Sequence, residues 1–267
     1  MSRGGGSRTR RRRRAGRPWR PWLRAGLLLA LGLAAGWLAN TLAPGPLRPS
    51  ADAAVEDVPP TLVRIAAYRE AGGGVEVAPA DGGADVLFVL YPGGLVRPHA
   101  YTWLGVALAP VGVRTLIPAM PLDLAVLGRD RASALIARLG EDERRTVVAG
   151  HSLGGAMAAG WADRHPGAAD GLIQMGAYPP SGTDLSGRDL PTLVLAAEHD
   201  GLASLTEVRE GMARLPERAG LEVVGGAVHA FFGRYGPQRG DGLPTVPRAT
   251  AEAEIAGAVE AFIASLR

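Results

Sequence analysis

The 267-residue sequence contains no cysteine, an absence that limits its chemistry. It excludes disulfides, metal sites built from thiolates, lipid attachment at a lipobox and a cysteine nucleophile. Lysine is absent too, so all 29 basic residues are arginine, a compositional bias to which we assign no function. Hydrophobic residues make up 47% of the chain, enough for a substantial core in one large domain with a short extension.

Acidic residues are missing from residues 1–24, which hold ten arginines. Such a basic segment is typical of a nucleic-acid partner, a solvated arm or a topogenic signal. The remaining 243 residues hold 19 arginines and 26 acidic residues, a net charge of −7. Because a hydrophobic run follows the arginines directly, we interpret residues 1–24 as the basic cytoplasmic segment of a topogenic signal. We therefore predict no nucleic-acid partner.

Residues 25–43 read AGLLLALGLAAGWLANTLA and carry no charge. This length is close to the roughly 20 residues that span a bilayer, and the positive-inside rule keeps the arginines cytoplasmic. We predict a single-pass signal anchor, with the remainder of the chain outside the cytoplasm. Cleavage after residues 51–53 (ADA), followed by secretion, is the alternative, and a buried soluble helix is a third reading.

Residues 44–60 hold five prolines and no hydrophobic periodicity, which is typical of a linker. From residue 61 to 267, short apolar runs alternate with helical patterns, which predicts an α/β domain with a mostly parallel central sheet flanked by helices. Residues 61–80 are expected to add one or two antiparallel edge strands. The other predicted strands are 86–91, 114–117, 146–149, 171–175, 192–196 and 221–224. The predicted helices are 100–109, 130–139, 153–165, 205–215 and 250–266.

The motif Gly150-His151-Ser152-Leu153-Gly154 lies between a predicted strand and a predicted helix and matches G-x-S-x-G. In a nucleophile elbow, a serine occupies a strained turn from strand to helix, and neighbouring side chains would clash there. The helix that follows directs its first amides at the site, so the amide of Leu153 can stabilise an oxyanion. We predict Ser152 as a nucleophile; the alternative is an ordinary glycine-rich turn.

A serine nucleophile needs a base, and the base needs an acceptor that fixes its tautomer. With a nucleophile elbow, the chain order is serine, acid, histidine, and the acid and histidine follow later strands. Asp200 follows the apolar strand TLVLAA, and His229 follows the strand LEVV. We predict His229 as the base and Asp200 as the acid that orients it. Glu198 is the main competitor, because strand alternation puts it on the same face as Asp200.

The other four histidines fit the base less well. His99 precedes the serine, His151 is adjacent to it, His165 lies at a predicted helix end and His199 neighbours the acid.

The second oxyanion donor is expected in the turn that follows the strand VLFVLY, where the sequence reads Tyr91-Pro92-Gly93-Gly94. Its glycines present backbone without side chains beside the elbow. We favour the amide of Gly94, with Gly93 next, although a glycine pair after a strand is also common in a simple turn. No metal or organic cofactor is expected.

These residues resemble the α/β hydrolases related to dienelactone hydrolase (carboxymethylenebutenolidase), especially bacterial members with a membrane-proximal N-terminus. The similar segments are YPGGLVRPHAY at 91–101, MPLDLAVL at 120–127, AGHSLGGAMA at 149–158, GLIQMGAYP at 171–179 and GGAVHAFFGRYGPQRGDG at 225–242. The resemblance implies an α/β-hydrolase fold, a triad of Ser152, Asp200 and His229, and hydrolase activity. The dienelactone enzymes proper use a cysteine nucleophile, so the serine here favours ester chemistry.

Together these features predict an anchored, extracytoplasmic serine hydrolase that acts on a small carboxylic ester through an acyl-enzyme. An aspartate at the elbow would be needed for a dehalogenase or an epoxide hydrolase, so the serine excludes those branches. An acyltransferase or a peptidase on the same triad remains an alternative, as does a non-catalytic surface-binding protein.

The site is predicted to lack a large cap. Only the 14 residues PPSGTDLSGRDLPT separate Tyr178 from Leu193, and they are too polar and too rich in glycine and proline for a helical cap. A site without a cap favours short acyl groups. Residues 231–247 can fold over the pocket from the His229 side. Their polar residues would then favour a polar or anionic substrate: Arg234, Gln238, Arg239 and Asp241.

Overall fold

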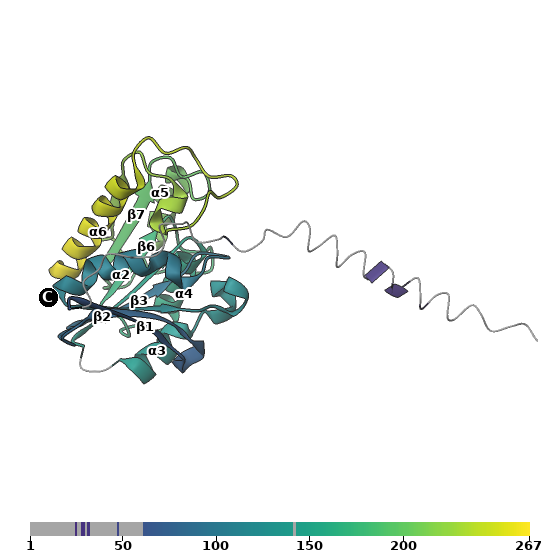
Figure 1. Cartoon of the computed structure of the whole chain (residues 1–267). Coiled ribbons are helices and arrows are strands. Elements are labelled where there is room, and N and C mark those ends of the chain that lie inside the picture. Colours follow the sequence, from purple (N-terminus) through teal and green to yellow (C-terminus); the bar gives the residue numbers. More distant parts are fainter. Residues whose placement is uncertain (1–24, 26–27, 30, 33–46, 48–60, 141–142) are drawn as a thin grey trace, which may run out of the picture. The chain divides into compact units, whose positions relative to one another are not determined.

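The computed structural model describes residues 25, 28–29, 31–32, 47, 61–140 and 143–267 (Figure 1). The chain divides into two units, Met1–Gly45 and Pro46–Arg267. The predicted basic segment 1–24 lies outside the described residues, as does most of the apolar run 25–43; of the predicted linker 44–60, only Leu47 is described. No helix among the described residues is long and apolar enough to cross a membrane.

In the described part of Pro46–Arg267, eight strands form one sheet in the order β1-β2-β4-β3-β5-β6-β7-β8. The strands are β1 (Val63–Tyr68), β2 (Gly74–Pro79), β3 (Val86–Tyr91), β4 (Val113–Pro118), β5 (Arg145–His151), β6 (Gly171–Met175), β7 (Thr192–Ala197) and β8 (Gly220–Val224). β2 pairs antiparallel with both β1 and β4. All other neighbouring strands are parallel. The one or two antiparallel strands expected in residues 61–80 are therefore present as β1, at the edge of the sheet, and β2 next to it.

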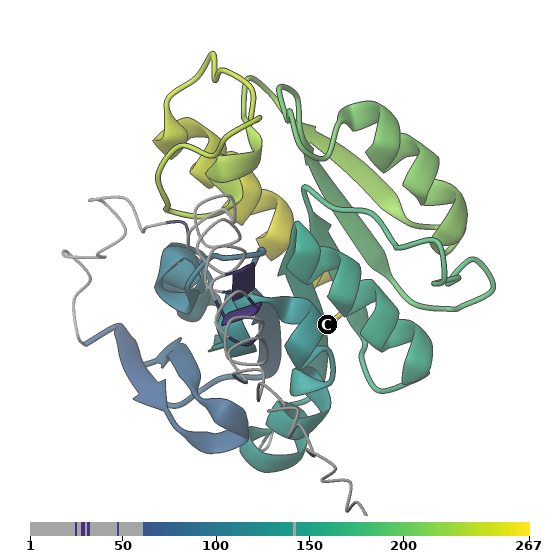
Figure 2. The same cartoon turned by 90° about the vertical axis from the view of Figure 1, so that its right-hand side faces the viewer.

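Helices cover both faces of this sheet, and Figure 2 shows the sheet between them. The α-helices that follow β2 along the chain are α2 (Thr102–Leu108), α3 (Arg131–Leu139), α4 (Leu153–Arg164), α5 (Leu205–Gly211) and α6 (Arg248–Ser265). The 3₁₀ turns are η2 (Glu70–Gly72), η3 (Pro98–Tyr101), η4 (Ala109–Val111), η5 (Pro121–Asp123), η6 (Ala125–Gly128), η7 (Met212–Arg214) and η8 (His229–Phe232). One apolar core joins the sheet to α2 and α6, and a second joins it to α3, α4 and α5.

Strand β3 shows how the sequence produces these two cores. All six of its residues are buried, as expected for a parallel strand with both faces covered. Phe88 and Leu90 pack in the core beneath α2 and α6, whereas Leu87 and Val89 pack in the core beneath α3 and α4. Successive side chains of a strand point to opposite faces, so one continuous apolar run supplies both layers.

The predicted strands agree with the observed bounds to within two residues at either end. Two predicted helices are shorter than expected. The segment predicted at 100–109 is α2 flanked by η3 and η4, because Pro110 has no amide hydrogen to continue the α-helical bonding. The segment predicted at 205–215 ends as an α-helix at Gly211 and continues as η7, since Leu215 precedes Pro216 and is extended.

The connection between β6 and β7, residues 176–191, contains turns and no helix. No large cap is therefore inserted at this point of the sheet. The mostly parallel sheet, the two helical layers and the missing cap confirm the predicted α/β fold class.

Candidate active site

The candidate site lies where the order of the strands reverses. The chain passes from β3 to β4 on one side of β3 and then returns to β5 on its other side. In open α/β sheets, ligands bind outside the carboxyl ends of the strands at such a point. The turn after β5 and the loop after β3 meet here, because a Cβ atom built on Gly154 would collide with the backbone oxygens of Tyr91 and Pro92.

Ser152 occupies the turn between β5 and α4 with φ 53° and ψ −125°. A non-glycine residue in such a sparsely populated region costs about 1–3 kcal/mol and persists only where its surroundings impose it. Two features impose it here. The Ser152 amide donates to the Met175 carbonyl of β6 (2.9 Å), and a Cβ atom on Gly150 would overlap the backbone of Gly154. The two glycines of the motif therefore allow the turn that exposes Ser152 at the end of the sheet.

Asp200 and His229 meet at the carboxyl ends of β7 and β8. His229 Nδ1 lies 2.7 Å from Asp200 Oδ2, and both side chains are buried. The other carboxylate oxygen, Asp200 Oδ1, accepts the amides of Leu202 (2.8 Å) and Ala203 (2.7 Å). These bonds orient the carboxylate toward the imidazole. A Cβ atom on Gly176 would lie only 3.2 Å from both Asp200 Oδ2 and His229 Nδ1, so a glycine follows β6 at the point of closest approach.

The bond to Asp200 determines the tautomer of neutral His229. A carboxylate only accepts hydrogen bonds, so Nδ1 carries the proton and Nε2 is left with its lone pair. Nε2 has no hydrogen-bond partner among the described residues. The ring lies against the serine turn, since its centroid is 4.5 Å from that of His151, the residue before Ser152. The structure thus brings the three predicted triad residues to one end of the sheet.

Asp241 holds the turn that carries His229, a role the sequence did not suggest. Its Oδ1 accepts the amide of His229 (3.0 Å), and its Oδ2 accepts the amide of Ala230 (2.9 Å). Arg234 pairs with Glu252 (2.8 Å). If residues 231–247 lie over the pocket, Arg234 and Asp241 are among the side chains predicted to favour a polar or anionic substrate, and in the structure both bond to protein groups. Asp241 lies 12 residues beyond His229, and no motif marks it as a partner of that turn.

Glu198 has a different partner from the one it would need as the acid. Its Oε2 accepts the amide of Gly226 (2.7 Å), which links the ends of β7 and β8. His165, one of the histidines compared with His229 as the base, stacks on Trp161, with ring centroids 4.9 Å apart. Of the two acids weighed, only Asp200 bonds to His229 in the described structure.

In the loop after β3, the Gly94 amide has no acceptor among the described residues. The Gly93 amide donates to the Tyr101 hydroxyl (2.9 Å), and the Leu95 amide donates to the Asp123 carbonyl (2.7 Å). Between them, the Gly94 amide remains available. A Cβ atom on Gly94 would lie 3.4 Å from the Leu153 side chain, so this loop borders the first turn of α4. The first amides of a helix also lack an intrahelical acceptor, which leaves the Leu153 amide available.

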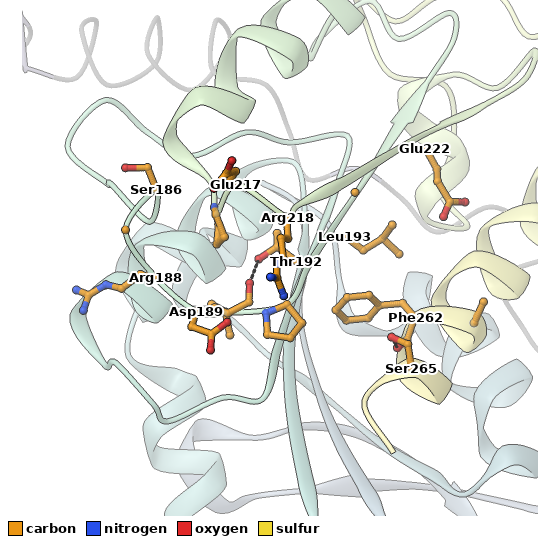
Figure 3. Close-up of a pocket in the computed structure, with 16 residues that line it drawn as sticks. Ser186, Arg188, Asp189, Thr192, Leu193, Glu217, Arg218, Glu222, Phe262 and Ser265 are labelled. Carbon is orange, nitrogen blue, oxygen red and sulfur yellow. Dashed lines mark hydrogen bonds between the residues drawn. The ribbon is translucent and has the colours of Figure 1, made fainter.

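A cavity of about 860 Å³ lies elsewhere in the molecule (Figure 3). Leu193 lies near the amino end of β7, Glu222 belongs to β8, and Phe262 comes from α6. Asp200 instead follows the carboxyl end of β7. The cavity therefore lies toward the amino ends of the strands, whereas Asp200 and His229 lie at the carboxyl ends.

The sheet order and the serine turn define a hydrolase scaffold of the α/β class, and the comparison with protein families agrees. A sequence model of the alpha/beta hydrolase family matches residues 87–253, from β3 into α6. The match covers more than half of the chain and includes Ser152, Asp200 and His229. The chain therefore belongs to the alpha/beta hydrolase family, which supports hydrolase activity. No curated protein matches the chain.

Proposed function

We propose that this chain is a serine hydrolase that cleaves a small carboxylic ester through an acyl-enzyme. The observation that carries the proposal is the 2.7 Å bond between buried His229 Nδ1 and Asp200 Oδ2. A base oriented in this way, at the same end of the sheet as a strained serine, supports the proposal, because a hydroxyl nucleophile needs an oriented base to activate it. Within the alpha/beta hydrolase family, the segments noted above favour relatives of dienelactone hydrolase, with serine chemistry in place of cysteine chemistry.

In the proposed reaction, Ser152 Oγ attacks the ester carbonyl while His229 Nε2 takes the hydroxyl proton. Asp200 stabilises the imidazolium that forms, and the amides of Leu153 and Gly94 bind the oxyanion. Collapse of the tetrahedral intermediate breaks the ester C–O bond, and His229 returns the proton to the leaving alcohol. Water then attacks the acyl-enzyme with His229 again as base, which releases the acid and restores Ser152.

The proposed substrate has a short acyl group. Residues 176–191 form no helical cap that would enclose a long chain. Of the residues predicted to favour a polar or anionic substrate, Arg234 and Asp241 bind protein groups, whereas Arg239 is exposed.

The proposed location is a membrane, with the hydrolase domain outside the cytoplasm. The arginines of residues 1–24 and the uncharged run at 25–43 support an anchor of this orientation. Secretion after cleavage near residues 51–53 is the alternative.

A fluorophosphonate probe tests the chemistry directly, because it forms a covalent adduct with an activated serine. We expect one adduct, placed on Ser152 by peptide mass spectrometry, together with hydrolysis of p-nitrophenyl acetate. Ser152→Ala should abolish both, whereas Ser181→Ala, which alters an exposed serine in the β6–β7 connection, should change neither. Folded protein that forms no adduct and hydrolyses no ester would refute the proposal and favour a binding function.

A further inference from the structure

A buried tyrosine and a buried histidine connect the three loops of the proposed site. The Tyr101 hydroxyl lies 2.8 Å from His151 Nδ1 and accepts the Gly93 amide at 2.9 Å. Both side chains are fully buried. His151 belongs to the serine turn, Gly93 to the loop after β3, and the His151 ring lies 4.5 Å from that of His229. The proposed reaction assigns no role to Tyr101 or His151. Together, however, these two residues contact the loop after β3, the serine turn and the His229 ring.

The hydrogen bonds of this cluster assign the protons. The Tyr101 hydroxyl accepts from Gly93, so its own proton is directed to His151 Nδ1, and neutral His151 carries its ring proton on Nε2. Burial, and after it the nearby His229, holds the pKa of His151 well below its usual value. His151 therefore stays neutral, and its ring adds no positive charge beside His229 when that base is protonated.

The same contacts determine the direction of the Gly94 amide. The peptide on one side is fixed by the Gly93 bond to Tyr101, and the peptide on the other is fixed by the Leu95 bond to Asp123. A Cβ atom on Gly93 would lie 3.0 Å from both the Tyr101 hydroxyl and His151 Nδ1, so a glycine is needed for this close approach. The loop thus donates its flanking amides to the protein and leaves the central one for a ligand.

We propose that Tyr101 and His151 are positioning residues. Through Gly93 they orient the Gly94 amide toward the oxyanion, and the His151 ring packs against the His229 ring. This inference rests on the proposed function, since it assigns a task within the same reaction. Preorganised donors act on charge that develops in the transition state. Loss of the positioning bond should therefore lower kcat more than it raises KM.

The first test is Tyr101→Phe in the full-length protein, which keeps the ring and removes the hydroxyl that holds Gly93. With p-nitrophenyl acetate, and with active sites counted by fluorophosphonate titration, we expect kcat to fall about 10- to 100-fold and KM to change less than about 3-fold. Tyr235→Phe is the matched control. It removes another buried tyrosine hydroxyl, which lies outside the Tyr101–His151 hydrogen bonds, donates to Gln238 (2.9 Å) and accepts no loop amide among the described residues. Its kcat should stay within about 2-fold of wild type.

The second test separates the hydrogen bond from packing. In His151→Asn, the side-chain oxygen takes the place of Nδ1 and accepts from Tyr101, whereas His151→Leu fills the space without an acceptor. We expect the Asn variant to keep a kcat several-fold above that of the Leu variant. Equal kcat values in the two variants, both near wild type, would overturn the role of His151.

Hydrogen exchange of residues 92–96, followed by mass spectrometry, gives a readout that does not require activity. Exchange should speed up in Tyr101→Phe and stay unchanged in Tyr235→Phe. Unchanged exchange, or an unchanged kcat in Tyr101→Phe while wild type is active, would refute the inference and leave the serine-hydrolase proposal intact. An inactive, unlabelled wild type would instead refute the proposed function and, with it, the positioning role.

Discussion

The carboxylate of Asp241 lies 3.0 Å from the backbone nitrogen of His229 and accepts its amide hydrogen. The second carboxylate oxygen accepts the next amide, that of Ala230, so one side chain fixes the start of η8. The candidate base is therefore held at two places: its ring by Asp200 and its backbone by Asp241. Residues distant in sequence thus combine to orient one imidazole.

Asp241→Asn should weaken this support. An asparagine has one acceptor oxygen, and its amide group would face a backbone N–H that also donates. Loss of a hydrogen bond to a charged group costs about 1.5–3 kcal/mol. We expect a lower melting temperature by several degrees and a several-fold fall in kcat. Thermal unfolding and p-nitrophenyl acetate hydrolysis measure the two effects. Asp189→Asn, which alters an exposed carboxylate at the distant cavity, should change neither.

Substitutions in the proposed triad should not add. Ser152→Ala and His229→Ala are each expected to reduce kcat to a similar extent, and the double variant should be no worse, because the two residues act as one unit. Asp200→Asn should reduce kcat strongly and leave residual activity.

Glu198→Gln is the control for the acid. Glu198 binds Gly226 rather than His229, so this variant should stay close to wild type in ester hydrolysis. An inactive Glu198→Gln with a nearly normal Asp200→Asn would transfer the role of the acid to Glu198.

The missing cap predicts a preference for short acyl chains. In a series of p-nitrophenyl esters below the critical micelle concentration, kcat/KM should be highest for acetate or butyrate and should fall toward longer chains. A rise toward the longest chains, or a jump in activity at the critical micelle concentration, would contradict a site without a lid.

The anchor is tested by shortening the chain. Full-length protein should sediment with membranes, and a chain that begins at Val55 should be soluble and active. A chain that begins at Pro46 is an informative comparison, because it retains Leu47. The Leu47 amide donates to the Leu95 carbonyl (2.8 Å) in the loop after β3, which also carries the Gly94 amide. We expect it to be soluble and at least as active as the shorter chain. Recovery of a mature N-terminus near Ala54 would establish a cleaved signal instead.

The sequence alone was sufficient for the sheet and for the order of the candidate residues. Apolar runs such as 86–91 and 171–175 are bounded by turn residues and alternate with helical patterns, so local propensity and burial act in the same direction there. The motif around Ser152 needs its glycines for local steric reasons, so the motif can be recognised from the sequence without knowledge of the packing. The order of Ser152, Asp200 and His229 along the chain is likewise independent of packing.

Only the tertiary structure decided between side chains that the sequence leaves equivalent. Glu198 and Asp200 lie two residues apart at one strand end, and their partners depend on how the β8 loop closes over them. Asp241 and Tyr101 lie in segments that resemble the hydrolase family, but nothing in those segments identifies their partners, because a hydrogen bond to a backbone amide requires only that distant segments meet at about 3 Å. Such contacts depend on how the loops that follow four strands pack together, and no periodicity along the chain predicts them.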